Sequence, residues 1–265
     1  MRLRPIGLTV ASVLLVAACS SASSTSPPVV TTPTSNTTAA PTTTLPPGCG
    51  EVASPAQSFT AQVVPTVAAI PVYDRPGGAE LRTLENPRLI NGDPNAAVPT
   101  VFLVKDAPTS ADCGWVEVYL PVRPNGSTGW VRRSDVAISA NPYRLVADLT
   151  DYTLTLFRSG EEVKVIDIAV AADNTPTPGG LYYITELVKT PNPDGAYGPY
   201  AYGLSGFSEV HQTFNGGPGQ LGIHGTNQPQ LIGQKVSNGC IRMRNDDITA
   251  LAEVLPLGVP VEVTT

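Results

Sequence analysis

The chain has 265 residues, a net charge of −6 and only 14% charged residues. It contains no basic patch or arginine-rich run, which argues against a nucleic-acid partner. Glycine (24 residues) and proline (27 residues) are abundant and favour strands and loops over long helices, so we expect a mainly β protein of one or two domains.

Residues 1–18 have the pattern of a secretion signal. Arg2 and Arg4 give it a positive start, and its apolar run from residue 6 is short for a membrane span. The run ends Leu-Val-Ala-Ala before Cys19, which resembles a bacterial lipobox. This resemblance implies cleavage before Cys19, lipidation of that residue and anchoring to the outer face of the cell membrane. Ordinary secretion, with Cys19 removed together with the signal, is the alternative.

Residues 19–48 are expected to be the lipidated cysteine followed by a disordered linker. The stretch is composed almost entirely of Ser, Thr, Pro and Ala and carries no charged side chain. Such a composition cannot bury enough apolar surface to fold. As a linker it would hold the folded part of the chain away from the membrane.

Residues 49–140 are predicted to form a small all-β domain. Short alternating apolar runs are separated there by turns rich in Gly, Pro and Asn. The segments 69–77 and 127–136 resemble the opening and the closing strands of bacterial SH3-like domains. The resemblance implies a small SH3-like β-barrel, which either binds cell-wall polymer or positions its neighbour. We expect Trp115 and Trp130 to be core aromatics rather than a ligand platform.

Residues 142–265 have longer apolar runs. Alternation over 152–156 and over 163–170, on either side of a Ser-Gly turn at 159–160, predicts a β-hairpin. The long segment 188–220 lacks clear periodicity and is expected to be an irregular functional loop or an exposed connector. We place His211 within it as a surface or lid residue.

One helix is predicted, beginning near Asn245. Its apolar side chains share one face, Asn245 is expected to cap it, and the two aspartates that follow suit the positive N-terminus of a helix. Alternation over 258–263 predicts a final strand.

Two short motifs near the C-terminus suggest a cysteine nucleophile. Residues 223–226 read Ile-His-Gly-Thr, and residues 236–243 read Val-Ser-Asn-Gly-Cys-Ile-Arg-Met. Cys240 follows an Asn-Gly pair that favours a tight turn, at which backbone N–H groups could stabilise an oxyanion. His224 lies 16 positions upstream (240 − 224), so it could fold back to act as base for the thiol. The alternatives are a buried structural thiol and a structural histidine.

These motifs, with Thr-Pro-Thr-Pro-Gly-Gly at 175–180, resemble the L,D-transpeptidases with a YkuD-type catalytic domain. The resemblance covers about residues 142–265 and implies a β-sandwich or mixed sheet with a short helix after the nucleophile. It implies that Cys240 attacks the carbonyl before the terminal D-Ala of a peptidoglycan stem peptide and forms a thioester. An amine of a neighbouring stem then resolves it to a 3→3 cross-link. No cofactor is implied, and carbapenem inhibitors are expected to acylate Cys240.

The resemblance also implies roles for neighbouring residues. Gly225 would orient the histidine through its carbonyl group. Arg242 would lie near the substrate carboxylate, the alternative being a structural salt bridge to an aspartate of the helix. Asn238 stands where the family has histidine, and an amide cannot ionise near neutral pH. Ser237, Asn238 and Gly239 are expected to contribute backbone donors.

The cysteine count bears on which thiol is free. If Cys19 is modified or removed, Cys49, Cys113 and Cys240 remain, and three cysteines cannot all pair within one chain. We predict a Cys49–Cys113 disulfide, because both residues precede the catalytic region in loop-like sequence, so Cys240 stays free. With two histidines and scattered cysteines, we predict no metal site.

Two other functions remain open at the level of sequence. Water could resolve the same thioester, which would make the protein an L,D-carboxypeptidase. Alternatively, the chain could be a wall-binding lipoprotein with a vestigial site, although it retains both the histidine and the cysteine.

Overall fold

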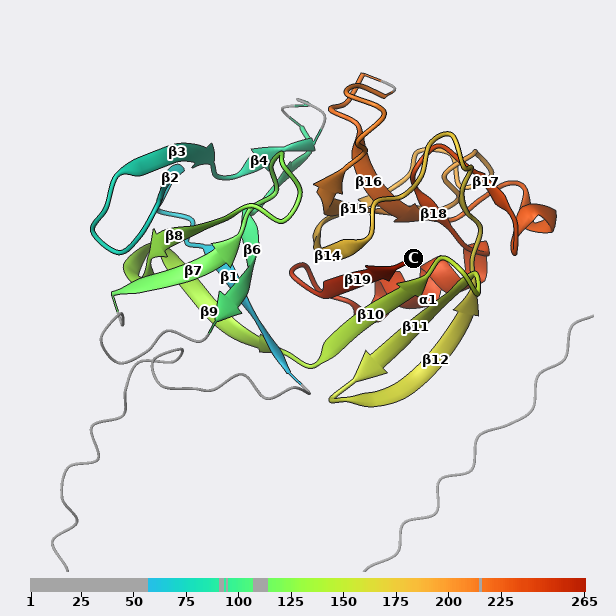
Figure 1. Cartoon of the computed structure of the whole chain (residues 1–265), viewed down its shortest axis with the longest axis horizontal. Coiled ribbons are helices and arrows are strands. Elements are labelled where there is room, and N and C mark those ends of the chain that lie inside the picture. The colour runs from blue at the N-terminus through green and yellow to red at the C-terminus, as the bar shows by residue number, and fades with distance from the viewer. Residues whose placement is uncertain (1–56, 91–92, 94, 107–113, 215) are drawn as a thin grey trace, which may run out of the picture. The chain divides into compact units, whose positions relative to one another are not determined.

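A computed structural model describes residues 57–90, 93, 95–106, 114–214 and 216–265 (Figure 1). All of them belong to one compact unit. The expected signal, lipidation site, linker and Cys49–Cys113 pair lie outside these residues. Within the described part of the chain, no helix is both long and apolar enough to cross a membrane.

The first sheet is antiparallel and consists of seven strands in the order β3-β2-β8-β7-β6-β1-β9. Its strands are β1 (Ser58–Val63), β2 (Ala69–Tyr73), β3 (Glu80–Glu85), β6 (Val101–Asp106), β7 (Trp115–Tyr119), β8 (Thr128–Arg132) and β9 (Val136–Asn141). The short strands β4 (Arg88–Leu89) and β5 (Ala97–Val98) form a separate pair. The β content agrees with the sequence, while an SH3-like barrel remains a prediction.

Alternation places most of the apolar side chains of this sheet on one face. Val116 and Val118 of β7 are fully buried in the core of the first sheet, whereas Glu117 between them is on the outward face. Trp115 and Trp130 lie on the outward face and are half-buried. The expectation that both are core aromatics was therefore wrong. In each strand the side chains alternate between the two faces of the sheet, and both tryptophans stand at positions that point outward. Trp115 packs edge-on against Tyr73, with ring centroids 5.0 Å apart.

The second sheet is mixed and consists of eight strands in the order β12-β11-β10-β19-β14-β15-β16-β18. Only the pairs β10–β19 and β16–β18 are parallel. Its strands are β10 (Tyr143–Asp148), β11 (Thr153–Arg158), β12 (Glu161–Asp167), β14 (Gly180–Lys189), β15 (Tyr200–Phe207), β16 (Gln220–His224), β18 (Ile241–Arg242) and β19 (Pro260–Thr264). A short parallel pair joins β13 (Val170–Ala171) to β17 (Lys235–Ser237).

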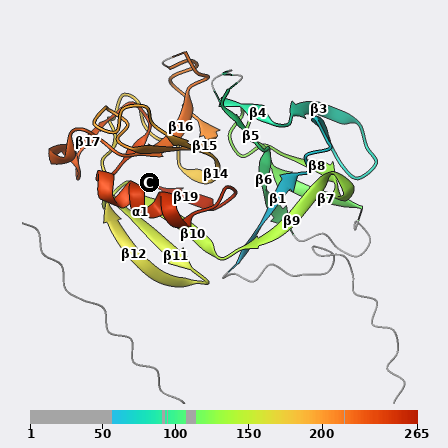
Figure 2. The ribbon, with the colours of Figure 1, turned by 180° about the vertical axis from the view of Figure 1, so that it is seen from behind.

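The second sheet and helix α1 (Asn245–Val254) enclose a single core. Ile248 and Leu251 of the helix are buried there together with side chains from both ends of the sheet. The hydroxyl of Tyr202 in β15 donates to Leu251 O at 2.9 Å and ties the helix to the sheet. The helix lies against β15 and β16 of the sheet, and Figure 2 shows it from the side opposite to that of Figure 1. A mixed sheet with one short helix after the cysteine motif is therefore confirmed.

Local sequence correctly predicted the hairpin of β11 and β12. Ser159 and Gly160 have φ values of 53° and 86°, and the strands on either side pair antiparallel. Two consecutive residues with positive φ are what a tight two-residue hairpin turn requires. The final strand β19 is also where the alternation placed it.

Two predictions for this region were wrong. The segment 188–220 is not irregular throughout, because it contains the end of β14 and the whole of β15, an eight-residue strand. Two glycines interrupt the apolar pattern of that strand, and one of them, Gly206, lies where a Cβ would be 2.3 Å from the ring of Tyr182. Asn245 does not cap α1. The residue before the helix is Arg244, which makes no side-chain cap, and the Asn245 side chain binds the loop after β16 instead.

The two sheets contact each other through a small third cluster. Tyr183 of β14 is fully buried between Val101 and Leu103 of β6, and its hydroxyl donates to Tyr119 O at 3.1 Å. Arg88 of β4 forms an ion pair with the buried carboxylate of Glu186 in β14. The contact combines apolar packing with a shielded charge pair.

Candidate active site

His224 is the last residue of β16 and is 4% exposed. Its Nδ1 lies 2.6 Å from the carbonyl oxygen of Gly225. Because a carbonyl can only accept, the proton of the neutral ring is on Nδ1, and Nε2 is left as the basic nitrogen. Parallel pairing of β16 with β18 sets His224 beside Arg242, and Met243 N donates to His224 O at 3.0 Å.

Cys240 is the last residue of the three-residue gap between β17, which ends at Ser237, and β18, which begins at Ile241. It is a free thiol and is half-buried. The turn before it depends on Gly239, which has a φ of 118°, a conformation that residues with a Cβ rarely adopt. The buried Ser237 fixes the turn, since its hydroxyl donates to Cys240 O at 2.5 Å and accepts from Gly239 N at 3.3 Å.

The threonines of the upstream motif support this cysteine loop. Thr175 Oγ1 donates to Ser237 O at 3.1 Å, and Thr177 Oγ1 donates to Gly239 O at 2.8 Å. Both threonines are buried, so each bond satisfies a carbonyl that solvent does not reach. The Thr-Pro-Thr-Pro-Gly-Gly segment therefore supports the loop that carries Cys240.

Two adjoining cavities meet at the histidine and the cysteine. The larger has a volume of about 300 Å³, and the smaller about 130 Å³. Both are lined by His224, Cys240, Tyr197 and Phe214. Another cavity of similar size, beside β13 and Asp173, contains neither of the two motif residues, so we assign no role to it. The paired cavities are the place where a substrate could reach the thiol.

Burial keeps the imidazole neutral. It lowers the pKa of His224 to about 4, an effect that the Gly225 carbonyl opposes and the Arg242 guanidinium reinforces. Near neutral pH the ring is therefore an unprotonated base, and it does not carry the charge of an imidazolium.

Burial also keeps the thiol protonated. It raises the pKa of the Cys240 thiol above its ordinary value, while the backbone N–H of Gly222 and the charge of Arg242 act in the opposite direction. With a neutral base and a neutral thiol in one cavity, proton transfer has to accompany attack by sulfur.

Arg242 and Asn238 line the smaller cavity. Among the described residues Arg242 forms no ion pair, and its buried Nε has no hydrogen-bond partner. The predicted alternative of a salt bridge to an aspartate of α1 is not found, because Asp247 pairs with Lys164 at 2.6 Å. Asn238 is exposed. Arg242 therefore leaves donors available to an anionic group in the cavity.

Sequence reasoning missed three residues of the site. Gly222 lies next to the sulfur: a Cβ built there would be 3.8 Å from Cys240 Sγ and 2.9 Å from Tyr202 O, so only glycine fits. Tyr197 places its ring 4.7 Å from that of His224. Asn245 accepts from Thr226 N at 2.8 Å and so fixes the loop after the histidine. The only sequence signal was the Gly-Pro-flanked aromatic pair near residue 197.

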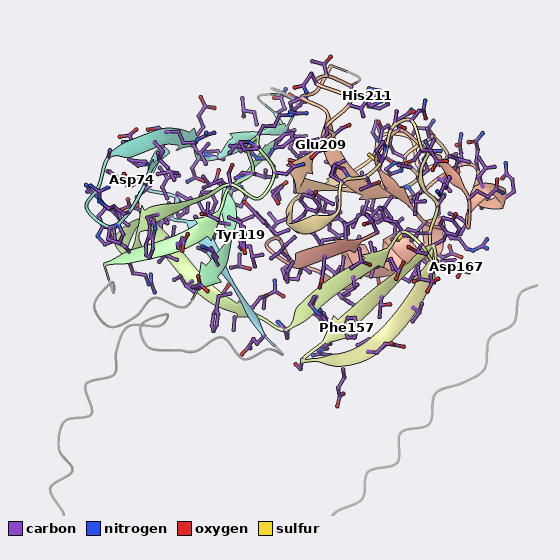
Figure 3. All side chains as sticks on the ribbon, viewed as in Figure 1. Asp74, Tyr119, Phe157, Asp167, Glu209 and His211 are labelled. Carbon is purple, nitrogen blue, oxygen red and sulfur yellow. The ribbon has the colours of Figure 1, made fainter. Side chains whose placement is uncertain are left out.

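The described residues contain no group of three or more His, Cys, Asp or Glu side chains placed to hold a metal ion. His211, which Figure 3 labels, lies in the segment between β15 and β16 and outside both motifs. Its ring is tilted by 47° to that of Phe214, with the centroids 5.6 Å apart.

Residues 142–263 match the YkuD family, the L,D-transpeptidase catalytic domain. The YkuD protein of Bacillus licheniformis, named as an L,D-transpeptidase, is 41% identical over 123 residues, and that of Bacillus subtilis is 38% identical over 122. Each match covers 46% of this chain and 66% of the relative, just under two thirds of its length. A second Bacillus subtilis relative, YqjB, is 29% identical over 138 residues, which are 48% of this chain and 73% of that protein.

Solved structures give a weaker likeness. An L,D-transpeptidase from Mycobacterium tuberculosis H37Rv aligns at 17% identity with a TM-score of 0.39, covering 54% of this chain and 75% of its own. The LdtMt1 structure in complex with imipenem aligns at 17% identity and a TM-score of 0.38, covering 57% and 90%. The sequence matches therefore carry the comparison: residues 142–263 are similar to the L,D-transpeptidase catalytic domain of the YkuD family.

Proposed function

We propose that this protein is a peptidoglycan L,D-transpeptidase that works through a thioester on Cys240, with His224 as the base. One observation carries the proposal. A free cysteine and a buried, neutral histidine line the same cavity within the YkuD-family domain, and the carbonyl of Gly225 sets the tautomer of the histidine.

In the first half-reaction, sulfur attacks the carbonyl carbon before the terminal D-Ala of a stem peptide. As the S–C bond forms, the thiol proton passes to Nε2 of His224. The resulting oxyanion needs N–H donors. The Cys240 N–H, which bonds to no described residue, is our candidate. The C–N bond then breaks, and D-Ala leaves as an amine with the proton from Nε2.

In the second half-reaction, a side-chain amine of a neighbouring stem attacks the thioester. It gives a proton to Nε2, the C–S bond breaks, and the thiolate is reprotonated. The product is an amide in a 3→3 cross-link, and no redox change occurs. The free donors of Arg242 in the smaller cavity would hold a stem carboxylate, and its positive charge would also stabilise the thiolate as it leaves.

The location of the enzyme is part of the proposal. A lipidated Cys19 and a linker over 19–48 would tether the enzyme outside the membrane, within reach of the wall. Carbapenems, as strained acyl donors, would form a stable thioester with Cys240.

The test compares the full chain with its Cys240→Ala variant on purified tetrapeptide stems, with and without an amine acceptor. We expect release of D-Ala and a cross-linked dimer from the wild type, and a loss of at least about a thousandfold in the variant. Release of D-Ala without a dimer would make the protein an L,D-carboxypeptidase. If no D-Ala is released and meropenem adds no mass to Cys240, the protein is a wall-binding lipoprotein and the proposal fails.

A further inference from the structure

The turn between β7 and β8 of the first sheet holds a backbone segment of the second. Arg123 Nη1 donates to Pro218 O at 2.8 Å, and its Nη2 donates to Ser208 O at 2.9 Å and to His211 O at 3.1 Å. Its guanidinium also lies over the ring of Phe207 at 4.7 Å. The guanidinium is planar, always charged and carries several N–H donors, so it can bind three carbonyl oxygens that converge on it.

Asn125, in the same turn, extends the contact. Its Nδ2 donates to Phe207 O at 2.8 Å, and its Oδ1 accepts from Phe207 N at 2.8 Å. The amide therefore pairs with the end of β15 much as a neighbouring strand would. Together Arg123 and Asn125 make five hydrogen bonds to the backbone of four residues, which lie 82 to 95 positions away in the chain.

The 208–219 segment, described at 208–214 and 216–219, is held in this way and forms part of the active-site wall. Its base is closed by the bond from Ser208 N to Gly219 O at 2.8 Å, and the buried Ser208 hydroxyl accepts from His211 N at 3.0 Å. Beyond that base, Phe214 lines both cavities at Cys240, and Gly217 to Gly219 line the larger one. Figure 3 labels Glu209 and His211, which lie on this segment.

The close approach at Gly219 fixes the path of the segment. Gly219 has a φ of 69°, and a Cβ there would lie 2.0 Å from His211 O, one of the carbonyls that Arg123 binds. Only glycine allows the segment to fold back so tightly, so the three carbonyls reach a single guanidinium. The larger cavity is also lined by Ile90, which follows β4. The region before residue 142 therefore affects the cavity in two ways, directly through Ile90 and indirectly through the segment that Arg123 and Asn125 hold.

We propose that Arg123 and Asn125 are positioning residues for acyl transfer, which hold the 208–219 segment against the cavity that contains Cys240. The region before residue 142 then takes part in binding the donor peptide through the wall it supports, in addition to any targeting role. This proposal rests on the proposed function, because the donor peptide is the ligand whose binding would change. It requires no contact between substrate and Arg123.

The test measures donor binding without chemistry. In a Cys240→Ala background of the full chain, calorimetry would give the Kd of a tetrapeptide stem for the parent and for the Arg123→Ala, Arg123→Lys and Asn125→Ala variants. The matched control is Arg132→Ala, an exposed arginine of β8 whose side-chain contacts with described residues are to Tyr73 and Trp115. We expect the Kd to rise at least about tenfold for Arg123→Ala, less for Arg123→Lys, and not for Arg132→Ala.

A second readout separates positioning from loss of fold. With Cys240 restored, alkylation of the thiol by iodoacetamide should stay within about twofold of wild type in each variant, because the hydrogen bonds of Arg123 go to Ser208, His211 and Pro218, which lie outside β16, β18 and the cysteine loop. Amide hydrogen exchange should rise in 208–219 alone. If Arg123→Ala does not fold, Asn125→Ala and Arg123→Lys decide the question.

The outcomes distinguish the two proposals. If the parent binds the stem and Arg123→Ala binds it equally well, the positioning role is overturned while the proposed function stands. If the parent itself binds no stem and meropenem leaves Cys240 unmodified, the proposed function fails and the positioning role fails with it. A rise in exchange across the whole chain would show that Arg123 serves only to hold the two sheets together.

Discussion

At the scale of single residues, burial acts in opposite directions on the two groups of the proposed pair. It removes the proton from His224 and retains the proton on Cys240, so both are neutral in the free protein. Arg242 partly offsets this for the thiol, since a nearby positive charge favours the thiolate. The geometry therefore favours a base that acts during attack over a preformed ion pair.

The pH dependence of alkylation distinguishes a neutral thiol and imidazole from a preformed thiolate–imidazolium pair. The rate at which iodoacetamide modifies Cys240, followed by mass spectrometry of its peptide over about pH 4–10, should rise through a single ionisation above that of an ordinary cysteine. A His224→Asn variant should keep nearly the same midpoint. A reactive plateau near about pH 5–7 that disappears in His224→Asn would mean that an ion pair exists.

The buried histidine also makes stability depend on pH. Its pKa is about 4 in the folded state and near 6.5 when unfolded, so between these values the unfolded chain binds the additional proton. The contribution of His224 is therefore complete above pH 6.5 and is lost as the pH falls toward 4.

Urea unfolding at pH 7 and at pH 4.5 measures the contribution of His224 to the free energy of unfolding. The loss of unfolding free energy on acidification should be about 2–3 kcal/mol larger in the wild type than in His224→Gln, which cannot titrate. Exposed carboxylates contribute equally to both proteins and cancel. Equal losses in the two proteins would mean that the ring is protonated, or solvated, in the folded state.

At the scale of elements, the loop that carries Cys240 is held by the strand-turn segment before β14. Thr177 donates its hydroxyl to Gly239 O at a buried position, and Gly239 itself adopts a φ that needs glycine. Each feature fixes the backbone next to the thiol. The position of the sulfur therefore depends on residues more than 60 positions earlier in the chain.

Thr177→Val tests this support while keeping the shape of the side chain. The change leaves Gly239 O without its buried donor and should cost about 1–3 kcal/mol of unfolding free energy, together with a clear drop in the rate of acylation by meropenem. The matched control is Thr249→Val on α1, whose hydroxyl bonds to Asn245 O at 2.7 Å at a half-buried site. If Thr177→Val is acylated at the wild-type rate, Thr177 does not position Cys240 for reaction.

At the scale of the whole molecule, the two sheets share the cluster around Tyr183. A fully buried tyrosine that fills this space and bonds to Tyr119 O couples the unfolding of one sheet to that of the other. The Arg88–Glu186 ion pair and the contacts of Arg123 act across the same boundary. We therefore expect the described part of the chain to unfold as one cooperative unit.

Two probes can report on each sheet separately. The protein has two tryptophans, both in the first sheet, while the accessibility of Cys240 reports on the second. Their urea transitions should coincide in the wild type. Tyr183→Ala should lower the unfolding free energy by about 3–5 kcal/mol and separate the transitions, and Tyr183→Phe should cost about 1 kcal/mol and keep them together. Separate transitions in the wild type would contradict this coupling.

The amino-acid sequence by itself determined the features that depend on neighbouring residues. The hairpin turn at Ser159 and Gly160, the strained turn at Gly239 and the apolar face of α1 each follow from conformational preference or periodicity within a few positions. The motifs that resemble the YkuD family are local in the same way, because the residues near Cys240 and His224 form short runs in the sequence.

The tertiary structure alone decided which distant groups meet. Strand β15 escaped detection because its glycines make room for Tyr182 and Glu186 of the neighbouring strand, a reason that exists only once the sheet is paired. Asn245 has the sequence of a helix cap, but a backbone N–H from another loop binds its side chain. The pairing of Arg123 with three carbonyls spans 85 to 95 positions, and no local pattern encodes a contact of that range, because packing of the two sheets creates it.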